Sequence, residues 1–80
     1  MKMVIINLMY FGSVMDATGK PAEKVESPET ISELNENLHT RYPGLAAISY
    51  RYSVNRKLVT ENQQLFNGDE IALLPPFAGG

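Results

Sequence analysis

The sequence has 80 residues, of which 44% are hydrophobic and 20% charged, and its formal net charge is −2. This composition is typical of one small globular domain and not of a disordered chain, and the slight acidic excess argues against nucleic acid and anionic membranes as partners. With no cysteine and one histidine, disulfides, thiolate nucleophiles and multi-histidine metal sites are excluded, so we expect no bound metal. No apolar run is long enough to span a membrane and no signal pattern opens the sequence, which predicts a cytosolic protein.

The first third of the chain predicts two strands around a short helix. Residues 3–10 form an apolar run rich in β-branched side chains, which predicts a strand inside the sheet and buried on both faces. Ser13 followed by Asp16 resembles a capping box, and Gly19 is a suitable residue to end the short helix. Residues 21–27 are polar and predict an edge strand protected by charge.

A second capping box predicts the main helix. Thr30 and Glu33 have the spacing of a capping box, and the Pro-Gly pair at 43–44 should end the helix. The residues at 45–48 should then return the chain across the core. His39 lies off the apolar stripe and is interpreted as a solvated helix residue, not a ligand or base. The stripe recurs at spacings of three and four and consists of Ile31, Leu34, Leu38 and Tyr42.

The second half of the chain predicts three strands. Residues 49–55 alternate aromatic and polar side chains, so Tyr50 and Tyr52 should face the main helix; stacking on a base or pterin is the alternative to a core role. A turn at 55–57 should lead into a short return strand at 58–59.

A loop and a tight turn should precede the last strand. The loop covers residues 61–67, with Leu65 or Phe66 turned inward, and Asn-Gly at 67–68 predicts the turn. The last strand covers 71–74. The resulting order is strand, short helix, strand, main helix and three strands, which predicts an α+β domain with one sheet and one main helix on a single face.

The end of the sequence has no evident role in a core. Pro75 and Pro76 cannot donate to a sheet and should leave it as a stiff, extended segment, so we divide the chain into a domain, 1–74, and a tail, 75–80. Gly79 and Gly80 have no Cβ and would fit a narrow channel of another protein. The terminal carboxylate is unhindered and is suited to activation as an acyl-adenylate, followed by transfer to sulfur or nitrogen. The alternative interpretation is a frayed, inert end.

Four stretches carry a family resemblance, and together they span nearly the whole chain. The order of elements and the closing glycines resemble the ubiquitin-like β-grasp fold, and more narrowly the MoaD/ThiS sulfur carriers. The short helix departs from the family pattern, because Met15-Asp16 stands where the family often has Arg-Glu. The four stretches are Tyr10-Phe11-Gly12 with the helix to Gly19, Val54-Asn55 with Leu58-Val59, Leu65 with Gly68-Asp69-Glu70, and Leu73-Leu74-Pro75-Pro76-Phe77-Ala78-Gly79-Gly80.

The resemblance implies a specific chemistry at Gly80. In this family a MoeB-like adenylyltransferase, related to ubiquitin-activating enzymes, uses ATP to adenylate the terminal glycine, and a sulfur donor converts it to a thiocarboxylate. The tail then enters a MoaE-like large subunit of molybdopterin synthase and gives its sulfur to cyclic pyranopterin monophosphate. The resemblance further implies a heterotetramer with two large subunits, no bound cofactor, and no catalytic acid or base in this chain.

Position and resemblance together nominate binding residues. Pro75, Pro76, Phe77, Ala78 and Gly79 are expected to occupy the channel of the partner, and an apolar patch at the root of the tail is expected to bind partners in turn. The nominated patch residues are Phe11, Leu58, Leu74 and Phe77, of which Phe11 and Leu74 have a plain core role as the alternative.

Charged residues near the predicted turns have structural alternatives. Arg51, Arg56 and Lys57 form a modest basic cluster that suits an acidic partner, although exposed charges near a turn are common. Asp69 and Glu70 point to opposite faces of a strand, which favours roles in the turn and in solubility over metal binding.

Three other classes of function stay open at this stage. One is a ThiS-type carrier for thiamin synthesis, with a thiazole synthase as partner. Another is a ubiquitin-like modifier or a carrier for cysteine synthesis. The last is a non-catalytic β-grasp interaction module with an inert tail, which would keep its function when the tail is deleted.

Overall fold

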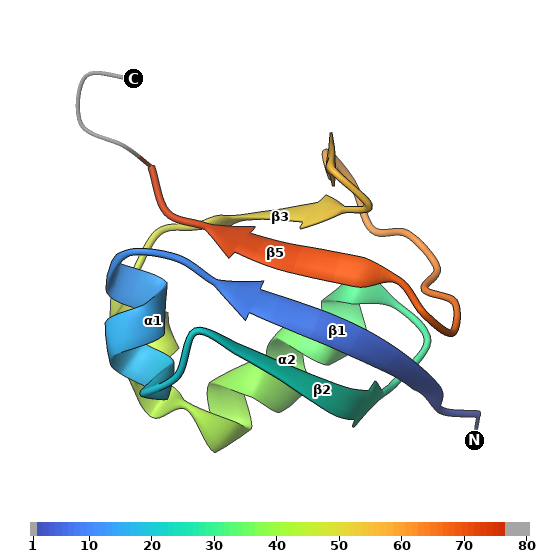
Figure 1. Ribbon diagram of the computed structural model, residues 1–80, viewed down its shortest axis with the longest axis horizontal. Coiled ribbons are helices and arrows are strands. Elements are labelled where there is room, and N and C mark those ends of the chain that lie inside the picture. Colours follow the sequence, from blue (N-terminus) through green and yellow to red (C-terminus); the bar gives the residue numbers. More distant parts are fainter. Residues whose placement is uncertain (1, 77–80) are drawn as a thin grey trace.

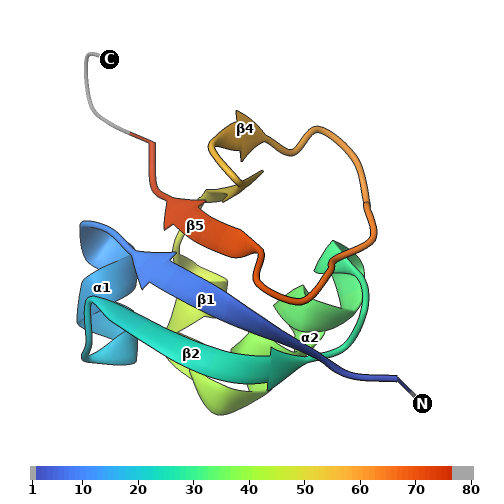
Figure 2. The same ribbon diagram turned by 45° about the vertical axis from the view of Figure 1, so that its right-hand side comes forward.

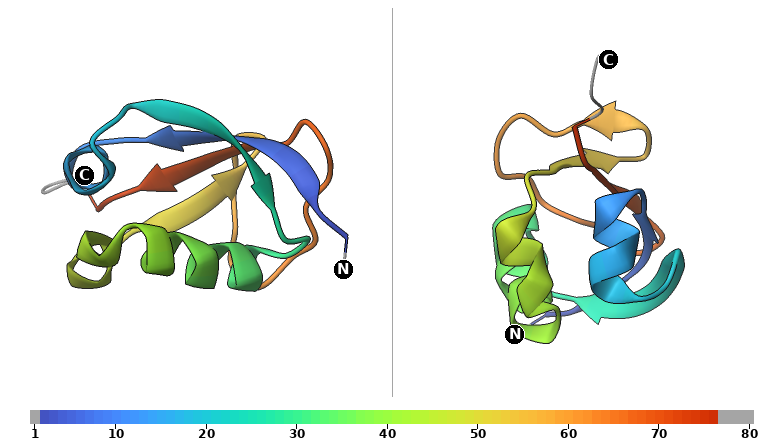
Figure 3. Two further views of the ribbon diagram at one scale, coloured as in Figure 1. Left: turned by 90° about the horizontal axis from the view of Figure 1, so that it is seen from below. Right: turned by 90° about the vertical axis from the view of Figure 1, so that its left-hand side faces the viewer.

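The computed structural model describes residues 2–76. The chain forms two layers, with a five-stranded sheet on one side and the main helix on the other (Figures 1 and 3). The strand order is β2-β1-β5-β3-β4, with β1 and β5 parallel and the other neighbours antiparallel. The predicted α+β architecture is therefore confirmed. Within the described residues, no helix is long and apolar enough to cross a membrane. The elements are β1 Val4–Tyr10, α1 Ser13–Thr18, β2 Ala22–Ser27, α2 Ile31–Arg41, the 3-10 helix η1 Pro43–Ala47, β3 Arg51–Val54, β4 Lys57–Leu58 and β5 Glu70–Leu74.

Strand β1 lies inside the sheet, between β2 and β5, but it is not buried on both faces. Every second side chain, from Val4 to Tyr10, points into the core, whereas Ile5 on the other face is 42% exposed. The prediction of two buried faces was wrong because α2 covers only one face of the sheet (Figure 3). Strand β2 is at the edge of the sheet, as predicted.

Helix α2 forms the second layer and begins with the predicted cap. The Thr30 hydroxyl accepts a hydrogen bond from the Glu33 backbone N–H at 3.2 Å, and Ile31, Leu34 and Leu38 are buried against the sheet. The helix ends at Arg41, before Pro43, as predicted. The return segment across the core is the 3-10 helix η1, whose Leu45 is fully buried.

Helix α1 begins differently from the prediction. Gly12 is its N-cap, with φ 55° and ψ −130°, and no side chain caps the helix, so the predicted capping box of Ser13 and Asp16 was wrong. The unusual backbone of Gly12 starts the helix one residue earlier and makes Ser13 its first residue. Gly19 ends α1 in the left-handed conformation with φ 79°, as predicted.

Strands β3 and β4 form a tight hairpin. Asn55 and Arg56 have φ values of 50° and 71°, which is the backbone of a two-residue hairpin turn. The return strand is Lys57–Leu58, one residue earlier than predicted. Farther along, Leu65 is fully buried and Phe66 is 60% exposed, which settles the alternative that the sequence left open.

The Asn-Gly turn before β5 is held by the carboxylate that precedes the strand. Gly68 has φ 88°, and the turn closes with a hydrogen bond from the Asp69 N–H to the Phe66 carbonyl at 3.1 Å. The Asp69 carboxylate accepts from the Phe66 N–H at 2.9 Å and from the Asn55 amide at 3.0 Å, while Glu70 is exposed. The interpretation of these two residues as turn and surface residues is confirmed.

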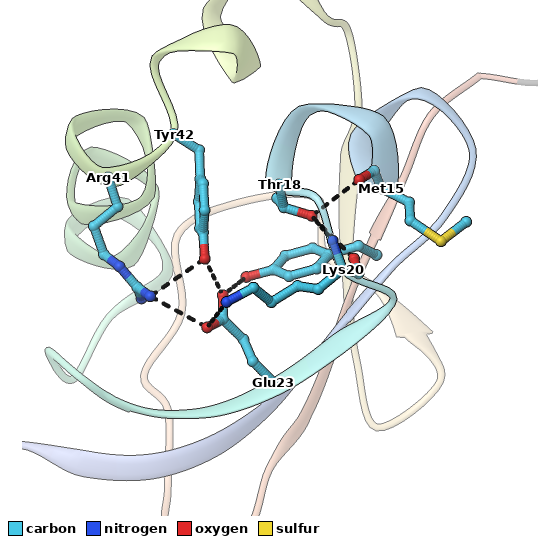
Figure 4. A network of polar contacts seen from close by, with 7 residues as sticks. Met15, Thr18, Lys20, Glu23, Arg41 and Tyr42 are labelled. Carbon is cyan, nitrogen blue, oxygen red and sulfur yellow. Dashed lines mark hydrogen bonds and ion pairs between the residues drawn. The ribbon is translucent and has the colours of Figure 1, made fainter.

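A polar cluster joins α1, β2 and the end of α2 (Figure 4). Glu23 accepts hydrogen bonds from the hydroxyls of Tyr10 and Tyr42, from the latter at 2.8 Å, and it pairs with Arg41 at 3.2 Å and Lys20 at 3.6 Å. Burial disfavours the charged carboxylate, but the hydrogen bonds from both tyrosines and the charge of Arg41 outweigh burial and lower the pKa of Glu23. Burial and the hydrogen bond to Glu23 raise the pKa of Tyr10.

Candidate functional site at the root of the tail

The tail leaves the domain where the two parallel central strands end. Tyr10 of β1 pairs with Leu73 of β5, so the loop after β1 lies beside the residues that follow β5 (Figure 1). Pro75 is buried and Pro76 is exposed. A Cβ at Gly12 would lie 3.1 Å from the Pro75 Cγ, which shows how closely the loop and the proline pack. Phe77, Ala78, Gly79 and Gly80 lie outside the described residues.

A groove of about 500 Å³ borders this root on the side of β3 and β4. Figure 2 shows β4 and the end of β5, between which the chain can be followed. Leu58 is 50% exposed and Leu74 is half-buried, so both present apolar surface to the groove. The groove therefore combines apolar side chains with the first residues of the predicted tail. Its lining residues are Ser49, Tyr50, Arg51, Leu58, Leu74, Pro75 and Pro76.

The face of the sheet opposite α2 continues this apolar surface. Strand register places Met9 beside Ala72, and Ala72 beside Ser53, which in turn pairs with Leu58. The two residues in the middle of this row, Ala72 and Ser53, are buried, so its accessible apolar side chains are Leu58 and, in part, Met9. A polar row follows on the same face and consists of Lys24, Asn7 and Glu70.

The residues nominated from the sequence fall into three groups. Leu58 and Leu74 line the same groove, whereas Phe11 is 41% exposed at the end of β1 and does not line it. Phe77 lies outside the described residues. The exposure of Phe11 and the partial exposure of Leu74 agree with an accessible surface more than with the alternative of a plain core role.

Sequence reasoning missed Tyr50 as part of the groove, nominated Arg51 only as a member of a basic cluster, and did not place Ser53 on this face of the sheet. Tyr50 was assigned to the core face, yet it is half-buried and lines the groove. The signal that locates Ser53 is the pairing of β3 with both β4 and β5, which depends on register and not on residue type.

Basic residues lie on one side of the groove, where Arg51 lines it and Lys57 precedes Leu58 of the lining. Arg51, Arg56 and Lys57 are exposed, and among residues 2–76 none of the three forms an ion pair. The surface at the root of the tail is thus apolar with a basic rim, although the chain as a whole is acidic. Such a surface suits a partner with apolar residues ringed by carboxylates.

The aromatic residues beside α2 are structural. The hydroxyls of Tyr50 and Tyr52 donate to the Asn35 side-chain oxygen at 2.7 and 2.8 Å, and Tyr52 is buried in the core. His39 is half-buried with its Nε2 2.7 Å from the Tyr50 oxygen, so the prediction of a solvated histidine was wrong. In the described part of the chain, no cluster of His, Asp or Glu side chains is arranged to hold a metal ion.

Comparison with known proteins identifies the family. The pattern of the ThiS family matches residues 8–80. The chain belongs to the ThiS family. Its relatives include the molybdopterin synthase sulfur carrier subunit of Homo sapiens, 33% identical with 94% of this chain and 93% of the relative covered. The sulfur carrier subunit of Mycobacterium tuberculosis is 34% identical, with 98% of this chain and all 100% of the relative covered.

Solved structures confirm the ubiquitin-like β-grasp fold. Small archaeal modifier protein 1 from Methanosarcina acetivorans superimposes with a TM-score of 0.84 over 100% of both chains, at 22% identity. A putative molybdopterin converting factor, subunit 1, from Pyrococcus furiosus gives a TM-score of 0.83 at 22% identity, covering 92% of this chain and 99% of that chain.

Proposed function

We propose that this ThiS-family chain is the sulfur carrier, small subunit of a molybdopterin synthase. The observation that carries the proposal is the near end-to-end match to two molybdopterin synthase sulfur carrier subunits at 33% and 34% identity. The apolar groove at the root of the tail supports it, because a carrier needs a surface that positions its terminus in a partner.

The proposed chemistry has three steps, all at the carboxyl group of Gly80. The carboxylate attacks the α-phosphate of ATP, which forms the acyl-adenylate and releases pyrophosphate. Hydrosulfide delivered by a sulfur donor then attacks the acyl carbon and expels AMP, which leaves a thiocarboxylate. Finally the thiocarboxylate sulfur attacks a carbon of cyclic pyranopterin monophosphate, the bond from that carbon to an oxygen breaks and the oxygen leaves with the electron pair, and water cleaves the acyl–sulfur bond to restore the carboxylate.

Catalytic groups for these steps are expected on the partners. The acyl-adenylate forms in a MoeB-like adenylyltransferase, and sulfur transfer takes place in a MoaE-like large subunit, within a heterotetramer. Closed partner sites protect the adenylate and the thiocarboxylate from water. This chain would bind no cofactor itself, ATP being consumed by the activating enzyme, and the cytosolic location stays a prediction.

On this proposal, the surface at the root of the tail binds both partners in turn. Leu58 and Leu74 supply apolar contact, while the residues from Pro76 to Gly79 enter the channel of the partner and Pro75 stays buried on the domain. Phe11 and Phe77 are proposed to add further apolar contact. The basic rim of Arg51, Arg56 and Lys57 would favour acidic partner surfaces and speed the encounter.

Partner choice tests the proposal against a ThiS-type role in thiamin synthesis. We would measure binding of the full chain to the molybdopterin synthase large subunit and to the thiazole synthase of the same organism by titration calorimetry. Binding to the large subunit alone is the expected result. Binding to the thiazole synthase alone would overturn the proposed pathway in favour of the thiamin pathway, and binding to neither would favour an interaction module.

A further inference from the structure

The root of the tail contains a fixed residue that the sequence assigned to the free segment. Pro75 follows the last strand and is buried, whereas its neighbour Pro76 is exposed. The loop after β1 packs against the proline ring, because a Cβ at position 12 would lie only 3.1 Å from the Pro75 Cγ. The first exposed residue after β5 is therefore Pro76.

The loop that receives Pro75 is itself held in place. Gly12 has φ 55° and ψ −130°, a combination open almost only to glycine, and its carbonyl accepts a hydrogen bond from the Met15 N–H at 3.0 Å. The Phe11 carbonyl accepts from the Val14 N–H at 3.1 Å. Helix α1 thus anchors the loop, and the loop restrains the proline.

We propose that Pro75, seated on Gly12, is a positioning residue for the reactions of Gly80. This inference rests on the proposed function. A tail that enters a narrow channel loses conformational freedom, and each residue that is already fixed lowers that loss. Because Pro75 is already fixed against the domain, five residues, 76–80, must be ordered in the partner instead of six. The fixed proline also sets the direction in which the chain leaves the domain.

The two neighbouring prolines provide a matched pair of variants. Pro75→Ala and Pro76→Ala remove the same ring and add the same freedom to the unfolded chain, but only the first loses the contact with Gly12. With the activating enzyme, ATP–pyrophosphate exchange would be followed for each full-length variant. We expect Pro75→Ala to lower kcat about three- to ten-fold with KM changed less than about twofold, and Pro76→Ala to have a clearly smaller effect.

A double-mutant cycle separates positioning from a loss of stability. Gly12→Ala should lower kcat in the chain with Pro75, because the new methyl group displaces the ring, and should have a smaller effect when residue 75 is alanine, where only the backbone strain at position 12 remains. Gly19→Ala is the control, since Gly19 also has a positive φ, 79°, but no atom lies within 4 Å of the added Cβ. This control should leave kcat unchanged in both backgrounds, although alanine at position 19 also strains the backbone, to a lesser degree than at position 12 because Gly19 is in the left-handed region.

The outcomes separate this inference from the proposed function. Equal effects of Pro75→Ala and Pro76→Ala on kcat, or an effect of Gly12→Ala that is the same in both backgrounds, would overturn the positioning role and leave the carrier function intact. No exchange with the wild-type chain, using an activating enzyme competent on another carrier, would overturn both.

Discussion

At the residue scale, the Glu23 carboxylate is the centre of a cluster of hydrogen bonds and ion pairs. It is shared by Tyr10, Tyr42 and Arg41, which come from β1, the residue after α2, and the last residue of α2 (Figure 4). Only 12% of the Glu23 side chain is exposed, so water cannot easily replace these donors. The cluster therefore fixes the end of α2 against the sheet.

Removal of this charge should destabilise the domain. Glu23→Gln keeps the shape of the side chain but weakens two tyrosine hydrogen bonds and the pair with Arg41, which should lower the free energy of unfolding by about 1–3 kcal/mol. Glu26→Gln, on the same strand and exposed, is the control and should change it by less than about 0.5 kcal/mol. Urea unfolding of the two variants checks the prediction, and equal effects would contradict it.

The lowered pKa of Glu23 also predicts how stability depends on pH. Because the folded pKa lies below the unfolded value of about 4.3, the carboxylate contributes its full stability above that value. The contribution is lost as the pH falls through the folded pKa. The difference in urea midpoint between the wild type and Glu23→Gln should therefore be largest near pH 7 and shrink below about pH 4. A difference that stays constant down to acid pH would disprove this assignment.

At the scale of the elements, two sequences with the same capping pattern fold differently. Thr30 caps α2 through Glu33, whereas Ser13 caps nothing because Gly12 turns the chain and begins α1. We expect Thr30→Ala to lower the free energy of unfolding by about 1 kcal/mol, and Ser13→Ala to change it by less than about 0.5 kcal/mol. Thermal or urea unfolding measures both, and a loss for Ser13→Ala as large as that for Thr30→Ala would be inconsistent with the observed caps.

Local patterns predicted the elements well, because apolar periodicity and turn residues act over a few positions. The spacing of Ile31, Leu34 and Leu38 was enough to predict α2, and Gly19 was enough to end α1. The exposed face of β1 could not be predicted from its own residues, since it depends on which face α2 covers. For the same reason, the choice between Leu65 and Phe66 stayed open until the loop was seen against the core.

Prediction of the candidate site had the same limit, because local features could be predicted and long-range contacts could not. Leu58 and Leu74 were found from position and resemblance, and they do share one groove. The burial of Pro75 was missed. The sequence shows that a proline ends sheet pairing, but it does not show that Gly12, 63 positions earlier, packs closely against the proline ring. Contacts between residues so far apart are set by the pairing of β1 with β5.

At the scale of the whole molecule, the proposed partner surface lies at one end only. Leu58 is 50% exposed beside the tail root, and Phe66 is 60% exposed in the turn that precedes β5, at the other end of that strand. We expect Leu58→Asp to weaken binding of the full chain to the large subunit by about tenfold or more, and Phe66→Asp to leave it nearly unchanged. Titration calorimetry compares them, and equal weakening by both variants would refute a surface confined to the root.

The central claim is that Gly80 carries sulfur, and intact mass spectrometry tests it most directly. The full chain would be incubated with ATP, a sulfide source and the activating enzyme of its host, beside a chain that lacks Gly80. The account predicts a mass gain equal to the exchange of one oxygen for one sulfur, seen only when Gly80 is present. No gain, with an activating enzyme that modifies another carrier under the same conditions, would contradict the account.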